Sequence, residues 1–100
     1  MKSGYKIDWS DEASTNLDSI IDYLIVNWTS REIRNFFRNL EKKLAVISKI
    51  PFAFPSNSSK ITIRRCVLSV QTSIYYEVKE DRVIILSLSD NRRDPNTLKF

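Results

Sequence analysis

The side chains best suited to chemistry in this 100-residue chain are cationic, and most of the charge surplus lies in its second half. Residues 1–50 carry a net charge of +1 and residues 51–100 one of +3. Arginine suits phosphate because its planar guanidinium donates two parallel hydrogen bonds. The candidate partner- or target-binding residues are Arg64, Arg65, Arg82, Arg92, Arg93 and Lys99. Two interpretations stay open: a surface for phosphates or an acidic protein, or exposed arginines paired with Glu77, Asp90 and Asp94.

Tyr75 and Tyr76 offer chemistry beyond charge. Adjacent strand residues point to opposite faces of a sheet, so we expect one tyrosine in the core and the other on the open face. For the same reason, only one of Arg64 and Arg65 should face the open side. A tyrosine beside an arginine could stack on a base or transfer a proton, and cross-strand packing is the competing interpretation. Glu77 could act as a general base only if it shares that face with an arginine.

The composition excludes several classes of site. The absence of histidine excludes Ser-His-Asp and Cys-His catalysis and imidazole metal ligands. A single glycine leaves no P-loop and no dinucleotide-binding loop. The acidic residues lack metal-ligand spacing, so we expect neither a metal nor a cofactor.

The cysteine count and the apolar runs bear on location. Cys66, the one cysteine, cannot form an internal disulfide, which fits a reducing compartment. The apolar runs fall far short of the roughly 20 residues that a membrane span needs. We therefore expect a cytoplasmic protein with no membrane partner.

The first half of the chain reads as a short strand followed by two helices. Residues 5–9 alternate between apolar and polar side chains, which predicts a strand. Ser10 then predicts the N-cap of a helix of roughly 17 residues with acidic side chains in its first turn. The sequence T-S-R-E, from Thr29 to Glu32, predicts a capping box that begins a second helix. Because about two residues connect them, the helices should form an antiparallel hairpin.

Prolines end this helical half. Pro51 and Pro55 cannot continue a helix, so residues 51–60 are predicted to form a loop. We expect Phe52 and Phe54 to hold this loop against the core.

The second half reads as three strands and a polar tail. The strands are predicted over residues 61–68, 70–79 and 82–89, the last two joined by a tight hairpin at Glu80-Asp81. The last strand has apolar residues at both its odd and its even positions, so we expect it to be central and covered on both faces. The order β-α-α-β-β-β predicts one α+β domain over residues 1–100. Its antiparallel helical hairpin should pack on one face of a small, mostly antiparallel four-stranded sheet and leave the other face partly open.

Several segments of the chain resemble the RelE/ParE superfamily, the toxins of bacterial type II toxin–antitoxin modules. The most specific is the C-terminal block, S-I-Y-Y-E-V, a short turn, V-I-I-L-S-L and D-N-R-R-D-P-N-T-L. Upstream, W-S-D-E-A, L-D-S-I-I-D-Y-L-I-V-N-W and P-F-A-F-P stand where the superfamily has its first helix and a proline-containing loop. The resemblance spans nearly the whole chain.

The resemblance implies a growth-inhibiting toxin neutralised by a cognate antitoxin, and the two branches of the superfamily imply different targets. A ParE-like toxin of a plasmid-stabilising module would bind DNA gyrase. A RelE-like toxin would cleave mRNA on the ribosome, with Arg64, Arg65, Tyr75 and Arg93 as candidate catalytic residues here.

We favour the ParE-like branch because the residues expected of the ribonuclease are largely missing. Lys99 or Phe100 stands where the resemblance implies a terminal acid, and only Lys60 stands where it implies two lysines. A non-toxic binding module of the same fold is a third interpretation. In each case, an antitoxin-like partner should bury exposed apolar surface and neutralise the arginine-rich face with an amphipathic helix or an added strand. We expect it to contact the outer face of the helical hairpin and the surface beside the second strand.

Overall fold

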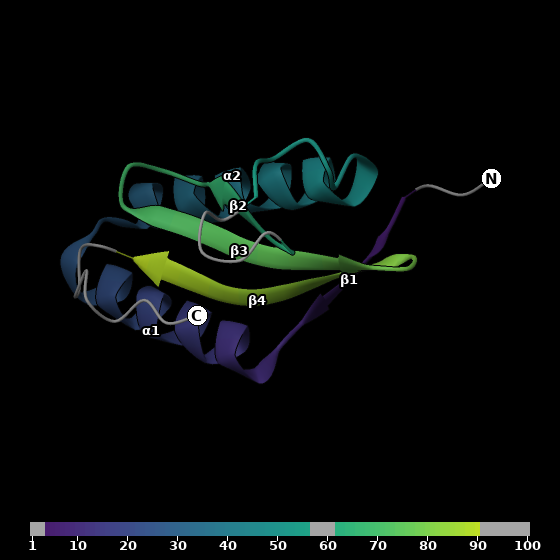
Figure 1. The fold of residues 1–100 in the computed structure, drawn as a ribbon. Coiled ribbons are helices and arrows are strands. Elements are labelled where there is room, and N and C mark those ends of the chain that lie inside the picture. The colour runs from purple at the N-terminus through teal and green to yellow at the C-terminus, as the bar shows by residue number, and fades with distance from the viewer. Residues whose placement is uncertain (1–3, 57–61, 91–100) are drawn as a thin grey trace.

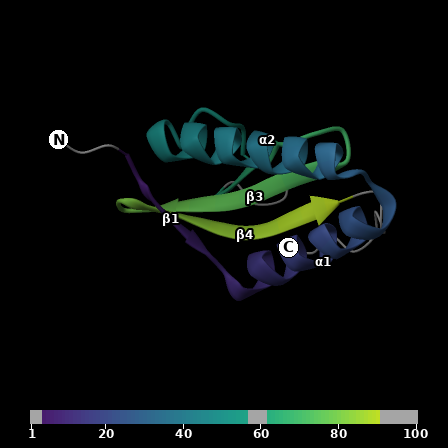
Figure 2. The same ribbon diagram turned by 180° about the vertical axis from the view of Figure 1, so that it is seen from behind.

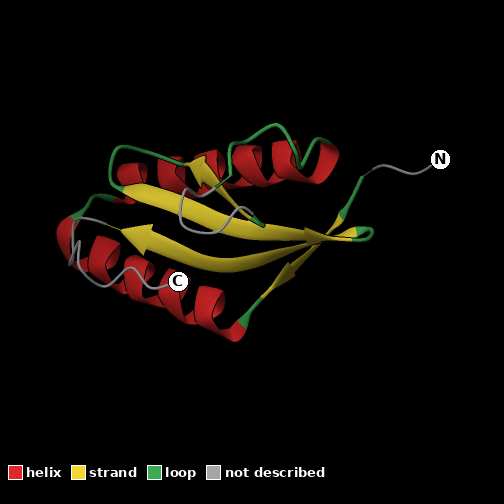
Figure 3. Cartoon of the chain, in the orientation of Figure 1, coloured by secondary structure: helices red, strands yellow, loops and turns green. Residues whose placement is uncertain are grey.

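A four-stranded mixed sheet and two helices make up the part of the chain that the computed structural model describes, residues 4–56 and 62–90 (Figure 1). The elements are β1 (Lys6–Trp9), α1 (Asp11–Asn27), α2 (Ser30–Lys49), β2 (Ile63–Val67), β3 (Thr72–Lys79) and β4 (Arg82–Asp90). The predicted α+β class and the order β-α-α-β-β-β are confirmed (Figure 3).

Both helices begin where their capping residues predict. The Ser10 hydroxyl accepts a hydrogen bond from the Ala13 N–H at 3.0 Å, which satisfies a donor that the first turn of α1 would leave unpaired. Thr29 and Glu32 form the complete capping box of α2, each side chain accepting from the other residue's backbone N–H.

The sheet has the strand order β1-β4-β3-β2, with β1 parallel to β4 and the other pairs antiparallel. Both helices pack on the same side of this sheet (Figure 2). The core between the layers consists of buried side chains from all these elements except β1, among them Ile20, Leu24, Phe36, Leu40, Ile47, Cys66, Ile74, Tyr76, Val83 and Ile85. The mostly antiparallel sheet with a helical hairpin on one face is as predicted.

Helix α1 also covers the edge of β4 beyond the end of β1. Strand β1 stops at the pair Trp9–Ile85, so among the described residues no strand pairs with the rest of β4 on that side. The Ser10 hydroxyl donates to the Leu86 carbonyl at 2.9 Å, and the Asn16 side-chain oxygen accepts from the Leu88 N–H at 3.0 Å. These contacts satisfy edge groups that would otherwise be open to another strand.

A β-bulge interrupts the pairing of β3 with β4. Tyr76 pairs with Ile85 and Tyr75 with Ser87, so Leu86 has no partner residue in β3. Strand β4 lies between two strands, as predicted, but Ile84 and Leu86 are only half-buried. Its outer face is therefore only partly covered, and the expectation of full cover on both faces is wrong there.

The loop after α2 is held by one phenylalanine and not by two. Phe54 packs against the core as predicted. Phe52 is 59% exposed, so its expected core role is wrong. Its ring instead meets the edge of Tyr5, with centroids 6.5 Å apart, and lies 4.9 Å from the Arg64 guanidinium carbon.

The hairpin between β3 and β4 turns at Glu80-Asp81, as predicted, and Glu80 has a φ of 55°. A side chain in this left-handed region is strained, and glycine is not. Glu80→Gly should raise the free energy of unfolding by about 0.5–1 kcal/mol in urea denaturation. Asp81→Gly is the matched control, and because Asp81 has no positive φ it should lower stability. Equal effects of the two substitutions would contradict the strain at Glu80.

Candidate functional site

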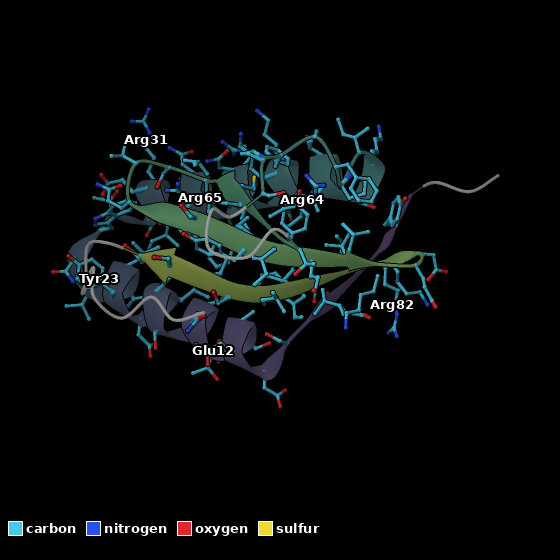
Figure 4. The ribbon with its side chains drawn as sticks, in the orientation of Figure 1. Glu12, Tyr23, Arg31, Arg64, Arg65 and Arg82 are labelled. Carbon is cyan, nitrogen blue, oxygen red and sulfur yellow. The ribbon has the colours of Figure 1, made fainter. Side chains whose placement is uncertain are left out.

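Arg64 and Arg65 lie on opposite faces of β2, as the strand period predicts. Arg64 pairs with Tyr76, whose side chain is in the core, and Arg65 pairs with Tyr75 on the outer face. Figure 4 shows the two arginines on the side of the molecule where α2 and β2 lie. Only Arg65 is therefore available to the outer face of the sheet.

Arg64 holds the loop that follows α2. Its guanidinium donates a hydrogen bond of 2.7 Å to the Phe54 carbonyl and a longer one of 3.5 Å to the Phe52 carbonyl. The same group lies over the Phe52 ring. Within the described residues, the Arg64 guanidinium therefore contacts two carbonyls and an aromatic ring. It does not pair with a carboxylate there, as the salt-bridge interpretation would require. These contacts give Arg64 a structural role.

The outer face carries a row of polar side chains across three strands: Arg65, Tyr75 and Ser87. The exposed Arg65 donates from its Nε to the Ser73 hydroxyl at 3.2 Å. Tyr75 is only 5% exposed, so the expectation that one of the two tyrosines is open is wrong. It lies on an inner strand, flanked by residues on both sides. The Ser87 hydroxyl is buried without a hydrogen-bond partner among the described residues.

Tyr76 is fixed in the core and is not available to a substrate. Its hydroxyl donates a hydrogen bond of 2.6 Å to the Pro51 carbonyl. Burial raises the pKa of Tyr76 to about 12, and the neighbouring Cys66 thiol adds to the rise. The residue therefore stays protonated as a donor that ties the loop to the sheet.

This pKa makes the contribution of Tyr76 to stability depend on alkaline pH. Folded Tyr76 keeps its proton up to about pH 12, whereas the unfolded chain releases it near pH 10. The hydroxyl's contribution is therefore complete below pH 10 and falls as pH rises, by at most about 1.4 kcal/mol per pH unit. Tyr76→Phe should cost about 1–2 kcal/mol at pH 7, and this cost should shrink above pH 10 in urea denaturation. A cost that stays constant from pH 7 to pH 11 would contradict the assignment.

The remaining predicted cations do not join one site. Arg82 donates to the Asp8 carboxylate at 2.6 Å near the β3–β4 hairpin, far from Arg64 and Arg65 (Figure 4). Glu77 lies 4.0 Å from Lys79 and makes no ion pair with an arginine in the described part of the chain. Three of the candidate binding cations, Arg92, Arg93 and Lys99, fall outside the described residues, as does Lys60.

A second cationic surface, which the sequence-based set omits, lies on α2. The exposed side chains on the solvent side of this helix include five cations, here called the α2 ridge: Arg31, Arg34, Arg38, Lys42 and Lys49. The net charge of residues 1–50 is only +1, although this half contains the ridge, because α1 carries four acidic residues and no Lys or Arg. Counting charge by helix would have found it.

An apolar surface lies where the α1–α2 turn meets the loop after β2. Here a pocket of about 280 Å³ is lined by Trp28, Glu32, Asn35, Phe36, Asn39, Leu68, Ser69 and Gln71. The Asn39 side chain donates to the Leu68 carbonyl at 2.7 Å and fixes the loop to α2. Beside the lining residues in sequence, Val67 is 50% exposed and Val70 is 91% exposed. Val67 lies on the same face of β2 as Arg65, whereas Val70 lies in the loop that lines the pocket, and an exposed valine there favours contact with another protein.

Residues 4–56 and 62–90 contain no group of three or more Cys, Asp or Glu side chains that could hold a metal ion. Neither described helix is long and apolar enough to cross a membrane.

Comparison of the sequence with protein-family models decides the family. Residues 7–95 match the model described as "ParE toxin of type II toxin-antitoxin system, parDE". The chain belongs to the ParE toxin family. It is thus the toxin of a type II toxin–antitoxin system, and membership implies a cognate antitoxin as its partner. No curated protein sequence matches it.

Solved structures share the fold of this ParE-family chain at low sequence identity. The chromosomal ParDE system of P. aeruginosa matches with a TM-score of 0.72 and 16% identity over 89% of this chain and 98% of the other. The protein HP0894 of Helicobacter pylori matches with a TM-score of 0.58 and 19% identity, over 88% and 96% of the two chains. YafQ of E. coli matches with a TM-score of 0.59 and 13% identity, over 88% of this chain and 94% of the YafQ chain. At these identities the likeness establishes the fold alone.

Proposed function

We propose that this toxin stops bacterial growth by binding DNA gyrase in the cytoplasm, as part of a plasmid-stabilising module. The observation that carries the proposal is the ParE match over residues 7–95. Two of the three described candidates of the ribonuclease alternative support it as well, whereas the third, Arg65, is exposed. Arg64 is held by loop carbonyls, and Tyr75 is almost fully buried, so neither side chain is placed to reach an RNA ribose.

The antitoxin, we propose, binds the pocket between α2 and the loop after β2 together with Val70, and continues round the edge of β2 to Val67. The burial of two exposed valines and an open pocket would stabilise a complex through the hydrophobic effect. The amide groups of Asn35 and Gln71 lie in the same pocket and can orient a partner's backbone.

The exposed edge of β2 supports the same location. Strand β2 is an edge strand of the sheet that the described residues form, and its neighbouring strand there is β3. Near Arg64 and Arg65 the loop covers this edge, since the Arg65 N–H donates to the Pro55 carbonyl at 3.0 Å and Ser56 bridges to Arg64. Toward Val67 no described segment pairs with the edge, which leaves room for one strand of a partner.

Inducible expression in bacteria tests the proposed function. We expect growth arrest, loss of negative supercoiling in a reporter plasmid and intact messages by primer extension, all reversed by the co-expressed antitoxin. Leu24→Asp is the control, because a carboxylate in the buried core should prevent folding and abolish toxicity. Message cleavage in the ribosomal A site would favour the ribonuclease alternative. Normal growth with folded protein present would favour the non-toxic binding module.

A further inference from the structure

The α2 ridge forms a straight line of positive charge on the side of the helix opposite the core. At 3.6 residues per turn, its five cations fall within about 80° of arc, and they extend over about 27 Å of helix axis. The buried residues Phe36, Leu40 and Ile47 lie on the opposite side of α2. Figure 4 shows Arg31, the first cation, projecting from α2 away from the sheet.

The cations of the ridge are available for a partner. All five side chains are exposed. The ion pairs within the described residues are Lys79–Glu77 and Arg82–Asp8. No ridge cation is therefore paired with a carboxylate of these residues. The one hydrogen bond of a ridge side chain within that part is from Arg38 to the Asn35 side-chain oxygen, at 3.2 Å. Neighbouring cations of like sign repel one another, and a polyanion would relieve this repulsion.

The chemistry of the ridge favours nucleic acid over protein. A protein interface has an apolar or aromatic centre, whereas the arc of the ridge contains one small apolar residue, Ala45, and no aromatic residue. Contacts to a nucleic-acid backbone need only cations at regular intervals. Single strands are held largely by stacking on aromatic side chains, which the ridge lacks, so a double helix is the better match.

We propose that the α2 ridge binds the phosphate backbone of double-stranded DNA without sequence preference. Over 27 Å of axis the two strands of a duplex carry about sixteen phosphates, and the cations of the ridge can engage those on the facing side. The inference is independent of the proposed function, because the protein and DNA alone suffice to measure it. The ridge borders the pocket beside β2, because Asn35, which accepts the hydrogen bond from Arg38, also lines that pocket.

Fluorescence anisotropy of the full-length protein with a labelled duplex of about 20 base pairs tests this inference. We expect a dissociation constant of about 10⁻⁵ M at 50 mM salt, and a slope of log K against log salt of about −4. Arg34→Gln/Arg38→Gln removes two contacts from the middle of the ridge and keeps high helix propensity. It should reduce the size of the slope by about 2 and weaken binding at least about tenfold at 50 mM salt.

Lys6→Gln/Lys79→Gln is the matched control, because it removes two exposed cations that lie outside α2. It should bind the duplex nearly as the unmodified protein does. An equal loss in the control would overturn the inference, since net charge alone would then explain binding. The inference would also be overturned if the protein did not bind the DNA duplex at 50 mM salt. Binding of an RNA duplex or a single strand more than tenfold tighter than the DNA duplex would overturn it as well. Preferential binding of poly-glutamate would assign the ridge to an acidic protein instead.

Discussion

Val70→Glu should lower the affinity of the toxin for its antitoxin by about 30-fold, the largest effect we expect from a single surface substitution. Val70 is 91% exposed, so the change should leave the folded state intact. In the proposed complex, however, a carboxylate would be buried against apolar surface without a partner. Isothermal titration calorimetry with the purified antitoxin measures the affinity, and thermal denaturation measures the stability.

The matched control for this prediction is Val46→Glu. Val46 is also exposed, but it lies on α2 beyond Asn39, the last residue of that helix in the pocket lining. Glutamate is a good helix former, so folding should be unaffected. An antitoxin affinity lowered by Val46→Glu and unchanged by Val70→Glu would contradict the proposed docking surface.

Gly4→Ala should lower the free energy of unfolding by about 2 kcal/mol, although residue 4 lies near the end of the chain. Gly4 has a φ of 149°, which a residue with a side chain rarely adopts. An added Cβ would lie 2.8 Å from both the carbonyl oxygen and the hydroxyl oxygen of Ser48. The expected shift would break two hydrogen bonds of 2.7 Å, from the Tyr5 N–H to the Ser48 carbonyl and from the Ser48 hydroxyl to the Tyr5 carbonyl.

Urea denaturation of Gly4→Ala, Ser48→Ala and the double variant separates the two contacts at Gly4. Ser48→Ala removes only the hydroxyl, so it should cost about 1 kcal/mol. It should not rescue Gly4→Ala, because the carbonyl oxygen remains 2.8 Å from the new Cβ. Full rescue in the double variant, or no cost of Gly4→Ala, would contradict the account of this junction.

The elements of the fold that could be predicted are those set by local sequence. Ser10 and the pair Thr29–Glu32 fix the helix starts because a capping hydrogen bond joins residues only three apart. The change of apolar period after Pro51 likewise places the strands. The opposite orientations of Arg64 and Arg65 follow from the strand period alone.

The properties that could not be predicted depend on contacts between distant residues. Tyr75 is 5% exposed although it lies on the outer face, and the alternation of Tyr75 and Tyr76 does not reveal this burial. From the sequence, Arg64 is a candidate phosphate ligand. In the folded chain its guanidinium instead donates a hydrogen bond to the Phe54 carbonyl, a contact that the sequence does not reveal. The bulge at Leu86 depends on how β3 and β4 pair, and single-strand patterns carry no information on it.

Inhibition of purified DNA gyrase tests the central claim most directly. Gyrase, ATP and a relaxed plasmid would be incubated with increasing amounts of the folded toxin, with and without the antitoxin. We expect supercoiling to fall as toxin is added and to return fully when the antitoxin reaches a stoichiometric amount. Undiminished supercoiling in a large excess of folded toxin would contradict the assignment of gyrase as the target.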